Sequence, residues 1–73
     1  MRTRFAVTAV IRDGAYRLGR ADLNVAGYTP LDFLGDFDSY AAAQTKADEL
    51  NATVGLLPSE SARIVASTME RIR

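Results

Sequence analysis

The chain has 73 residues with nine basic and nine acidic side chains, and it contains neither cysteine nor histidine. A chain of this length forms at most one domain, placed here at residues 1–73, and it lacks the residue types for disulfides, Cys/His zinc sites and imidazole-based catalysis. The balanced charge argues against a strongly basic nucleic-acid-binding protein, and no apolar run approaches the length of a membrane span.

The first segment, TRFAVTAVIR at residues 3–12, alternates in the manner of a half-buried strand. The side chains expected to face the core are Phe5, Val7, Ala9 and Ile11. The Asp13-Gly14 pair that follows is typical of a type I′ turn, so the sequence predicts a β-hairpin. The outer face of this hairpin is expected to present Arg4, Thr8, Val10, Arg12 and Arg17.

The register of the hairpin conflicts with the apolar pattern of the second strand beyond Leu18. An uninterrupted second strand would place Arg20 and Asp22 on the face assigned to the core. One extra residue within Leu18–Arg20 would return Leu23 to that face, and Gly19 tolerates the backbone angles of a bulge. We therefore predict a β-bulge there; the alternative is that the second strand ends at Gly19.

Residues 26–36, AGYTPLDFLGD, contain two glycines and a proline and are typical of a turn followed by a connection. The apolar side chains of Leu31, Phe33 and Leu34 predict either a short third strand or a segment that folds back over the core without regular pairing, and we favour the latter. The candidate apolar contacts for a partner are Tyr28, Leu31 and Phe33.

Residues 37–55 predict a helix. Asp38 or Ser39 is suited to cap its first turn, and Gly55 to end it. The expected inward stripe, at helical spacing, consists of Tyr40, Ala43, Ala47, Leu50 and Val54.

Residues 58–72 predict a second helix, which begins with a proline that the first helical position tolerates. Its expected inward stripe consists of Ala62, Val65, Met69 and Ile72, widened by Ala66. The fold class is therefore α+β: an N-terminal β-hairpin followed by two α-helices packed on one face, in the order ββαα.

Residues 37–56, FDSYAAAQTKADELNATVGL, resemble a pattern found in small bacterial and mobile-element proteins of phages or plasmids. The pattern is F-x-S-Y-x-x-A, then L-N, G-L and a proline before a second helix. This chain departs from it at Leu57, where a capping serine is expected. The resemblance implies an accessory protein of a mobile element or its host, and it implies no catalytic residue.

Catalytic chemistry finds little support in the sequence. Asp32, Asp36 and Asp38 cluster in DFLGDFD, but they lack the spacing of a calcium loop, so we interpret them as a helix cap and turn residues. The serines and threonines have no histidine to activate them. We therefore expect no catalytic residue, no metal site, no cofactor and no enzymatic activity.

Two functional hypotheses remain. The first is a cytoplasmic protein–protein interaction module that modulates a host complex, since a small two-stranded ribbon leaves edges that a second copy or a partner strand could pair. We expect a homodimer on this ground, while the identity of any other protein partner is unknown. The second is a small nucleic-acid-binding regulator, because residues 1–20 hold five arginines and one aspartate. Neither hypothesis involves a membrane.

Overall fold

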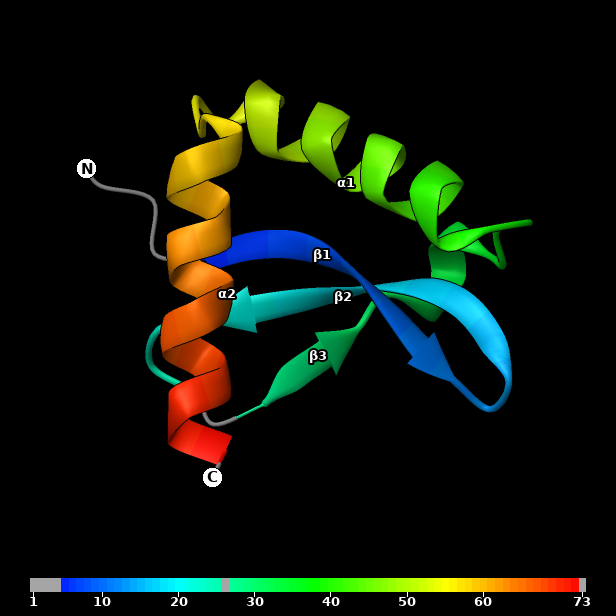
Figure 1. Cartoon of the computed structure of the whole chain (residues 1–73), viewed down its shortest axis with the longest axis horizontal. Coiled ribbons are helices and arrows are strands. Elements are labelled where there is room, and N and C mark those ends of the chain that lie inside the picture. Colours follow the sequence, from blue (N-terminus) through cyan, green and yellow to red (C-terminus); the bar gives the residue numbers. More distant parts are fainter. Residues whose placement is uncertain (1–4, 26, 73) are drawn as a thin grey trace.

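The computed structural model describes residues 5–25 and 27–72, with side chains described up to residue 70 (Figure 1). The elements in chain order are β1 (Phe5–Arg12), β2 (Ala15–Asp22), β3 (Tyr28–Pro30), a 3-10 turn η1 (Asp32–Leu34), α1 (Tyr40–Thr53) and α2 (Pro58–Ile72). Among the described residues the strands form one antiparallel sheet in the order β1-β2-β3. The predicted α+β arrangement, strands first and helices second, is therefore confirmed, with a short third strand.

The hairpin turn follows the prediction. Asp13 and Gly14 both have positive φ, at 53° and 76°, as a type I′ turn requires. The turn sets Arg12 opposite Ala15, and pairing then continues without a break to Phe5 opposite Asp22.

The predicted bulge at Leu18–Arg20 is therefore wrong, and so is its alternative of a strand ending at Gly19. Arg20 does lie on the same face as Val7, but its guanidinium carbon sits 4.1 Å from the centre of the Phe5 ring. The guanidinium also pairs with Asp22 at 3.3 Å and remains partly exposed. A cation that covers an aromatic ring and keeps contact with water can occupy the rim of a core face.

Gly19 serves close packing instead of a bulge. A Cβ atom at this position would lie 3.3 Å from Cβ of Tyr28 and 3.4 Å from Cγ1 of Val10. The bare backbone of Gly19 therefore lets these two side chains close over β2.

The connection after β2 forms a short strand and then folds back. Tyr28–Pro30 pairs with β2, whereas Leu31, Phe33 and Leu34, for which packing without regular pairing is favoured, lie outside this strand. The next residues fold back as expected: the Leu31 amide donates to the Leu18 carbonyl at 3.0 Å, and Leu34 and Phe37 pack against the core.

Helix α1 packs on a cluster formed by Val7, Ala9 and Leu18 of the sheet with its own Ala43 and Ala47. The Ser39 hydroxyl caps the helix by accepting from the Ala42 amide at 3.1 Å. Leu50 packs against the same cluster, but Tyr40 and Val54 are exposed, so the predicted stripe is confirmed only for its middle part.

Helix α2 packs in a different rotation from the predicted one. Its buried residues are Ser61, Ile64 and Thr68, whereas Ala62, Ala66 and Met69 face solvent. The predicted inward stripe is therefore wrong for those three; Val65 is half-buried, and the side chain of Ile72 lies outside the described part.

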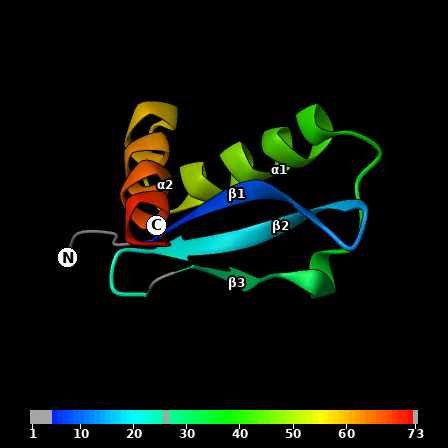
Figure 2. The ribbon, with the colours of Figure 1, turned by 60° about the horizontal axis from the view of Figure 1, so that its bottom comes forward.

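Hydroxyl groups explain this rotation. Ser61 donates to the Pro58 carbonyl and Thr68 to the Ile64 carbonyl, each at 3.0 Å, so both act as small, satisfied side chains at a close helix–sheet contact. Ile64 completes this contact by packing on Ala6. Both helices lie on the β1 side of the sheet, and β3 lies at the opposite edge (Figure 2).

The outer edge of β1 is covered by side chains of α1. Oδ1 of Asn51 accepts from the Val7 amide at 2.7 Å, and its Nδ2 donates to the Val7 carbonyl at 2.9 Å. Oε1 of Gln44 accepts from the Ala9 amide at 3.2 Å. The expectation of an open first strand is wrong at these two residues, so two copies cannot pair edge to edge along this part of β1.

We predict that Asn51→Leu lowers the free energy of unfolding by about 2–4 kcal/mol, because it leaves the amide and carbonyl of Val7 buried without partners. Urea unfolding measures this loss. The matched control Asn24→Leu makes the same change at an exposed position and should cost no more than about 0.5 kcal/mol. Equal losses in the two variants would show that the amide of Asn51 does not stabilise the edge.

Candidate functional site

The residues expected on the outer face of the ribbon do not form one surface. Thr8 is only 8% exposed, and Val10 is half-buried. Arg12 and Arg17 lie near the hairpin turn, where both take part in ion pairs, and Arg4 lies outside the described residues. The expectation of an exposed Thr8 is therefore wrong, because this side of β1 faces α2.

Arg12 and Arg17 belong to a network with three aspartates. Nε of Arg17 donates to Oδ1 of Asp36 at 2.6 Å, and its Nη1 lies 3.8 Å from both Asp13 and Asp32. Arg12 approaches Asp32 at 3.7 Å. The hydrogen bond and negative charge of Asp36 raise the pKa of the Arg17 guanidinium above its ordinary value. Within this network the carboxylates outnumber the guanidinium groups.

The acidic cluster has a different role from the expected one. Asp32 and Asp36 pair with arginines, so they are more than solvated turn residues, and Ser39 caps the helix in place of Asp38. Within the described residues, no group of three acidic, histidine or cysteine side chains is placed to hold a metal ion.

The three candidate apolar contacts have separate environments. Leu31 packs against the core, whereas Phe33 is 82% exposed. Tyr28 is half-buried and lines a shallow depression of about 170 Å³ with Val10 and Pro30. Burial raises the pKa of the Tyr28 phenol above its ordinary value, and the nearby Tyr40 adds a smaller increase.

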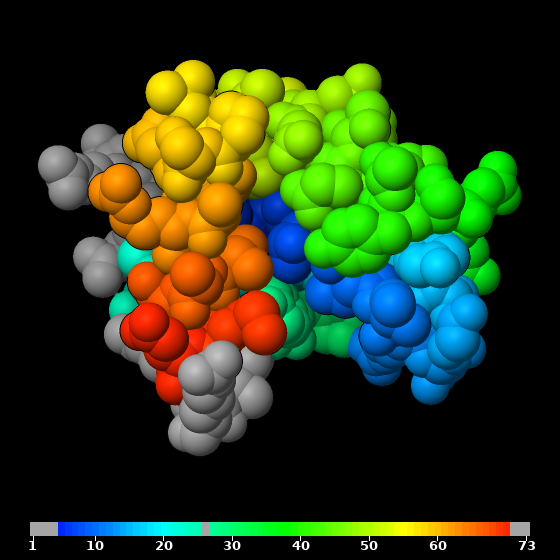
Figure 3. Space-filling model, in the orientation of Figure 1, coloured from blue at the N-terminus to red at the C-terminus, as the bar shows by residue number. Residues whose placement is uncertain are grey.

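A larger hollow of about 400 Å³ lies between α1 and α2, with β1 as its floor. In Figure 3, β1 is visible in dark blue at the bottom of the gap between the green α1 and the orange α2. The wall from α2 carries Ala62, Val65, Ala66 and Met69. These are the side chains that the sequence assigned to the core. Their helical spacing was recognised correctly, but they line the hollow and do not pack against the sheet.

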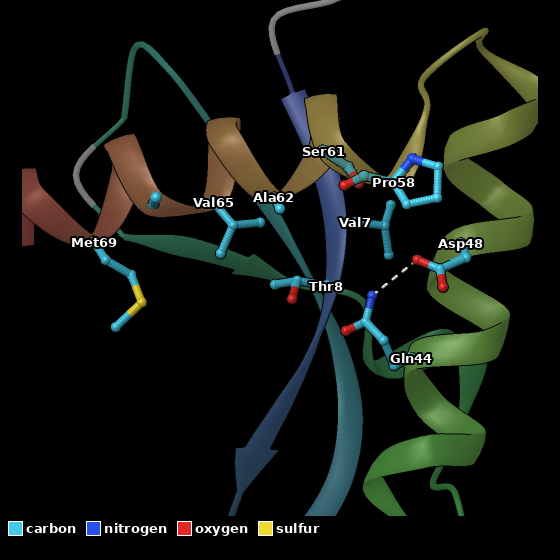
Figure 4. A pocket seen from close by; sticks show the side chains of 10 residues that line it. Val7, Thr8, Gln44, Asp48, Pro58, Ser61, Ala62, Val65 and Met69 are labelled. Carbon is cyan, nitrogen blue, oxygen red and sulfur yellow. Dashed lines mark hydrogen bonds between the residues drawn. The ribbon is translucent and has the colours of Figure 1, made fainter.

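Polar groups occur at defined places in this apolar hollow. Thr8 lies on its floor, between Val65 and Gln44 in the view of Figure 4. Among the described residues, no side chain or carbonyl forms a hydrogen bond with the Thr8 hydroxyl. On the α1 wall, Nε2 of Gln44 donates to Oδ1 of Asp48 at 3.0 Å, and Asp48 has no ion-pair partner within the described part.

This arrangement is suited to binding a side chain. The Ser61 hydroxyl donates to a carbonyl of its own helix, and among the described residues no carboxylate accepts a hydrogen bond from the Thr8 hydroxyl, so neither hydroxyl is paired with a base that would activate it. Apolar walls with a few placed polar groups are characteristic of recognition sites.

We predict that Thr8→Val changes the free energy of unfolding by no more than about 0.5 kcal/mol, because the hydroxyl has no protein partner to lose. The same substitution at Thr68, whose hydroxyl is buried and bonded to Ile64, should cost about 1 kcal/mol. Denaturant unfolding of the two variants provides the comparison. A larger loss for Thr8→Val would mean that this hydroxyl contributes to the fold instead of facing the hollow.

No family model matches the sequence, and searches of curated proteins and of solved structures gave no significant match. The resemblance of residues 37–56 to phage and plasmid proteins therefore stays a prediction. Among the described residues, no helix is long and apolar enough to cross a bilayer. The geometry of the hollow and the pairing of the arginines carry the functional conclusions.

Proposed function

We propose that this chain is a non-enzymatic, cytoplasmic protein–protein interaction module that binds a partner polypeptide in the hollow between α1 and α2. The observation that supports this proposal is the uncovered apolar stripe of α2. Its exposed members are Ala62, Ala66 and Met69, while two hydroxyl residues of the same helix are buried. An amphipathic helix that turns apolar side chains towards an open hollow is typical of a surface with a binding partner.

The resemblance to phage and plasmid proteins supports a more specific role, the modulation of a host complex by an accessory protein. A cysteine-free chain suits the reducing cytoplasm in which such a complex would be met. This role rests on the resemblance, whereas the binding surface rests on the geometry of the hollow.

Nucleic-acid binding has less support. Arg12 and Arg17 are engaged by Asp13, Asp32 and Asp36, and Arg20 is engaged by Asp22 and the Phe5 ring. Phosphate binding depends on cations that displace counterions from the backbone, and these guanidinium groups would first have to leave their carboxylates.

For the protein-binding site, we predict that Ala66→Arg abolishes capture of proteins that the wild-type chain retains from a bacterial lysate. An arginine side chain inside the hollow would occupy the space of the partner, and its charge would lose water beside the apolar groups of the partner. The control Ala42→Arg adds the same charge to an exposed face of α1 that does not line the hollow, and it should retain the same proteins. Circular dichroism checks that both variants are folded. Capture that survives Ala66→Arg would place the binding surface elsewhere.

For the ribbon, we predict no binding of short duplex DNA or single-stranded RNA in a fluorescence anisotropy titration at low salt. Arg17→Ala should leave this result unchanged, because the side chain is held by Asp36. Affinity that falls steeply with added salt and is lost in Arg17→Ala would instead support the nucleic-acid hypothesis.

A further inference from the structure

We propose that the hollow between α1 and α2 receives a lysine or arginine side chain of the partner polypeptide, with its aliphatic stem against α2 and its cationic end at Asp48. This inference rests on the proposed function, since it names the chemistry of the residue that anchors the partner. It follows from the charge, the floor and the walls of the hollow.

Asp48 supplies the charge. Its carboxylate lines the hollow and accepts a hydrogen bond from the neutral amide of Gln44 at 3.0 Å. The neighbouring acid on α1, Glu49, is paired with Lys46 at 3.5 Å, but no cation pairs with Asp48 among the described residues. A carboxylate beside an apolar hollow therefore favours a cationic guest and disfavours an anionic one.

Thr8 supplies a polar group at the floor. The residue is more than nine-tenths buried, its side chain faces the hollow, and its hydroxyl forms no hydrogen bond within the described part of the chain. A hydroxyl oxygen has two lone pairs and can accept a bond from an ammonium or guanidinium group. A purely apolar guest would leave this hydroxyl without a partner, which costs binding energy.

The walls suit the stem of a long basic side chain. Ala62, Val65, Ala66 and Met69 present methyl and thioether groups along one face of α2. Lysine and arginine place their methylene groups on such surfaces while the charged end reaches a polar group. The opposite wall carries Gln44 and Asp48, so the apolar and the charged parts of the guest meet opposite sides of the hollow.

Selection from a random linear peptide library displayed on phage tests this proposal with the intact chain as target. Peptides directed to the hollow are those that bind the wild type and Ala42→Arg but not Ala66→Arg. We expect each such peptide to contain a lysine or arginine whose replacement by norleucine weakens binding to the wild type by about 5-fold, as for a partly exposed ion pair.

The same pair of peptides is then titrated against two variants of α1. On Asp48→Asn the replacement should cost less than about 2-fold, because the carboxylate that favoured the cation is gone. On Glu49→Gln, which removes one negative charge from the same helix outside the hollow, the replacement should still cost about 5-fold.

The possible failures are distinguishable. Hollow-directed peptides that need no basic residue, or whose basic residue is equally important on Asp48→Asn, would overturn the basic anchor and leave the proposed function standing. If no selected peptide were sensitive to Ala66→Arg, both proposals would fall. A wild-type dimer that Ala66→Arg dissociates and Asp48→Asn does not would show that a second copy fills the hollow without a basic anchor, which overturns the inference.

Discussion

The pair of hydrogen bonds between the side-chain amide of Asn51 and the backbone of Val7 fixes α1 against the edge of the sheet. An amide side chain has the donor and acceptor of a peptide group, so Asn51 pairs with β1 as a neighbouring strand would. This contact holds α1 along the strand edge, and Gln44 repeats it at Ala9 about two turns earlier. Asp48 lies between these two residues on the same helix. The hydrogen bonds that cover the edge of β1 therefore also position the carboxylate on the α1 wall of the hollow.

The second constraint is the small size of the side chains where α2 meets the sheet. Ala6 and Ala21 are fully buried, and Ser61 and Thr68 of α2 are buried with hydroxyls that bond to carbonyls of their own helix. Small side chains allow a helix to approach a sheet closely, and with this face of α2 against the sheet Ala62, Ala66 and Met69 face solvent. The hollow is therefore a consequence of how the core is packed.

Local signals in the sequence predicted the local structure well. The Asp13-Gly14 turn, the cap at Ser39 and the extent of both helices follow from short-range chemistry that the residues themselves carry. The predicted bulge is absent because Arg20 is not a charge buried in the core. That residue instead covers the ring of Phe5, a contact that no local pattern reports.

The predicted inward face of α2 was wrong for a related reason. Two stripes at helical spacing compete on this helix, one through Ala62, Val65 and Met69 and one through Ser61, Ile64 and Thr68. Hydropathy favours the first, because it does not register that a hydroxyl bonded to its own helix behaves as a small apolar group. The candidate site lay in the residues that this choice assigned to the core. Likewise, the contact of Asn51 with a strand 44 positions away has no signature in the sequence.

The hairpin and the hollow differ in how their charged side chains are paired. At the hairpin end, Arg12 and Arg17 are compensated by aspartates from the turn and from the connection after β3, so those ion pairs tie the turn to the rest of the sheet. At the hollow, within the described residues, no cation pairs with Asp48 and no group forms a hydrogen bond with the Thr8 hydroxyl. The walls of the hollow come from β1, α1 and α2, which are distant in sequence, so this site exists only in the folded chain. A partner that binds there binds the native state alone, and it therefore stabilises a domain whose small size leaves its own stability marginal.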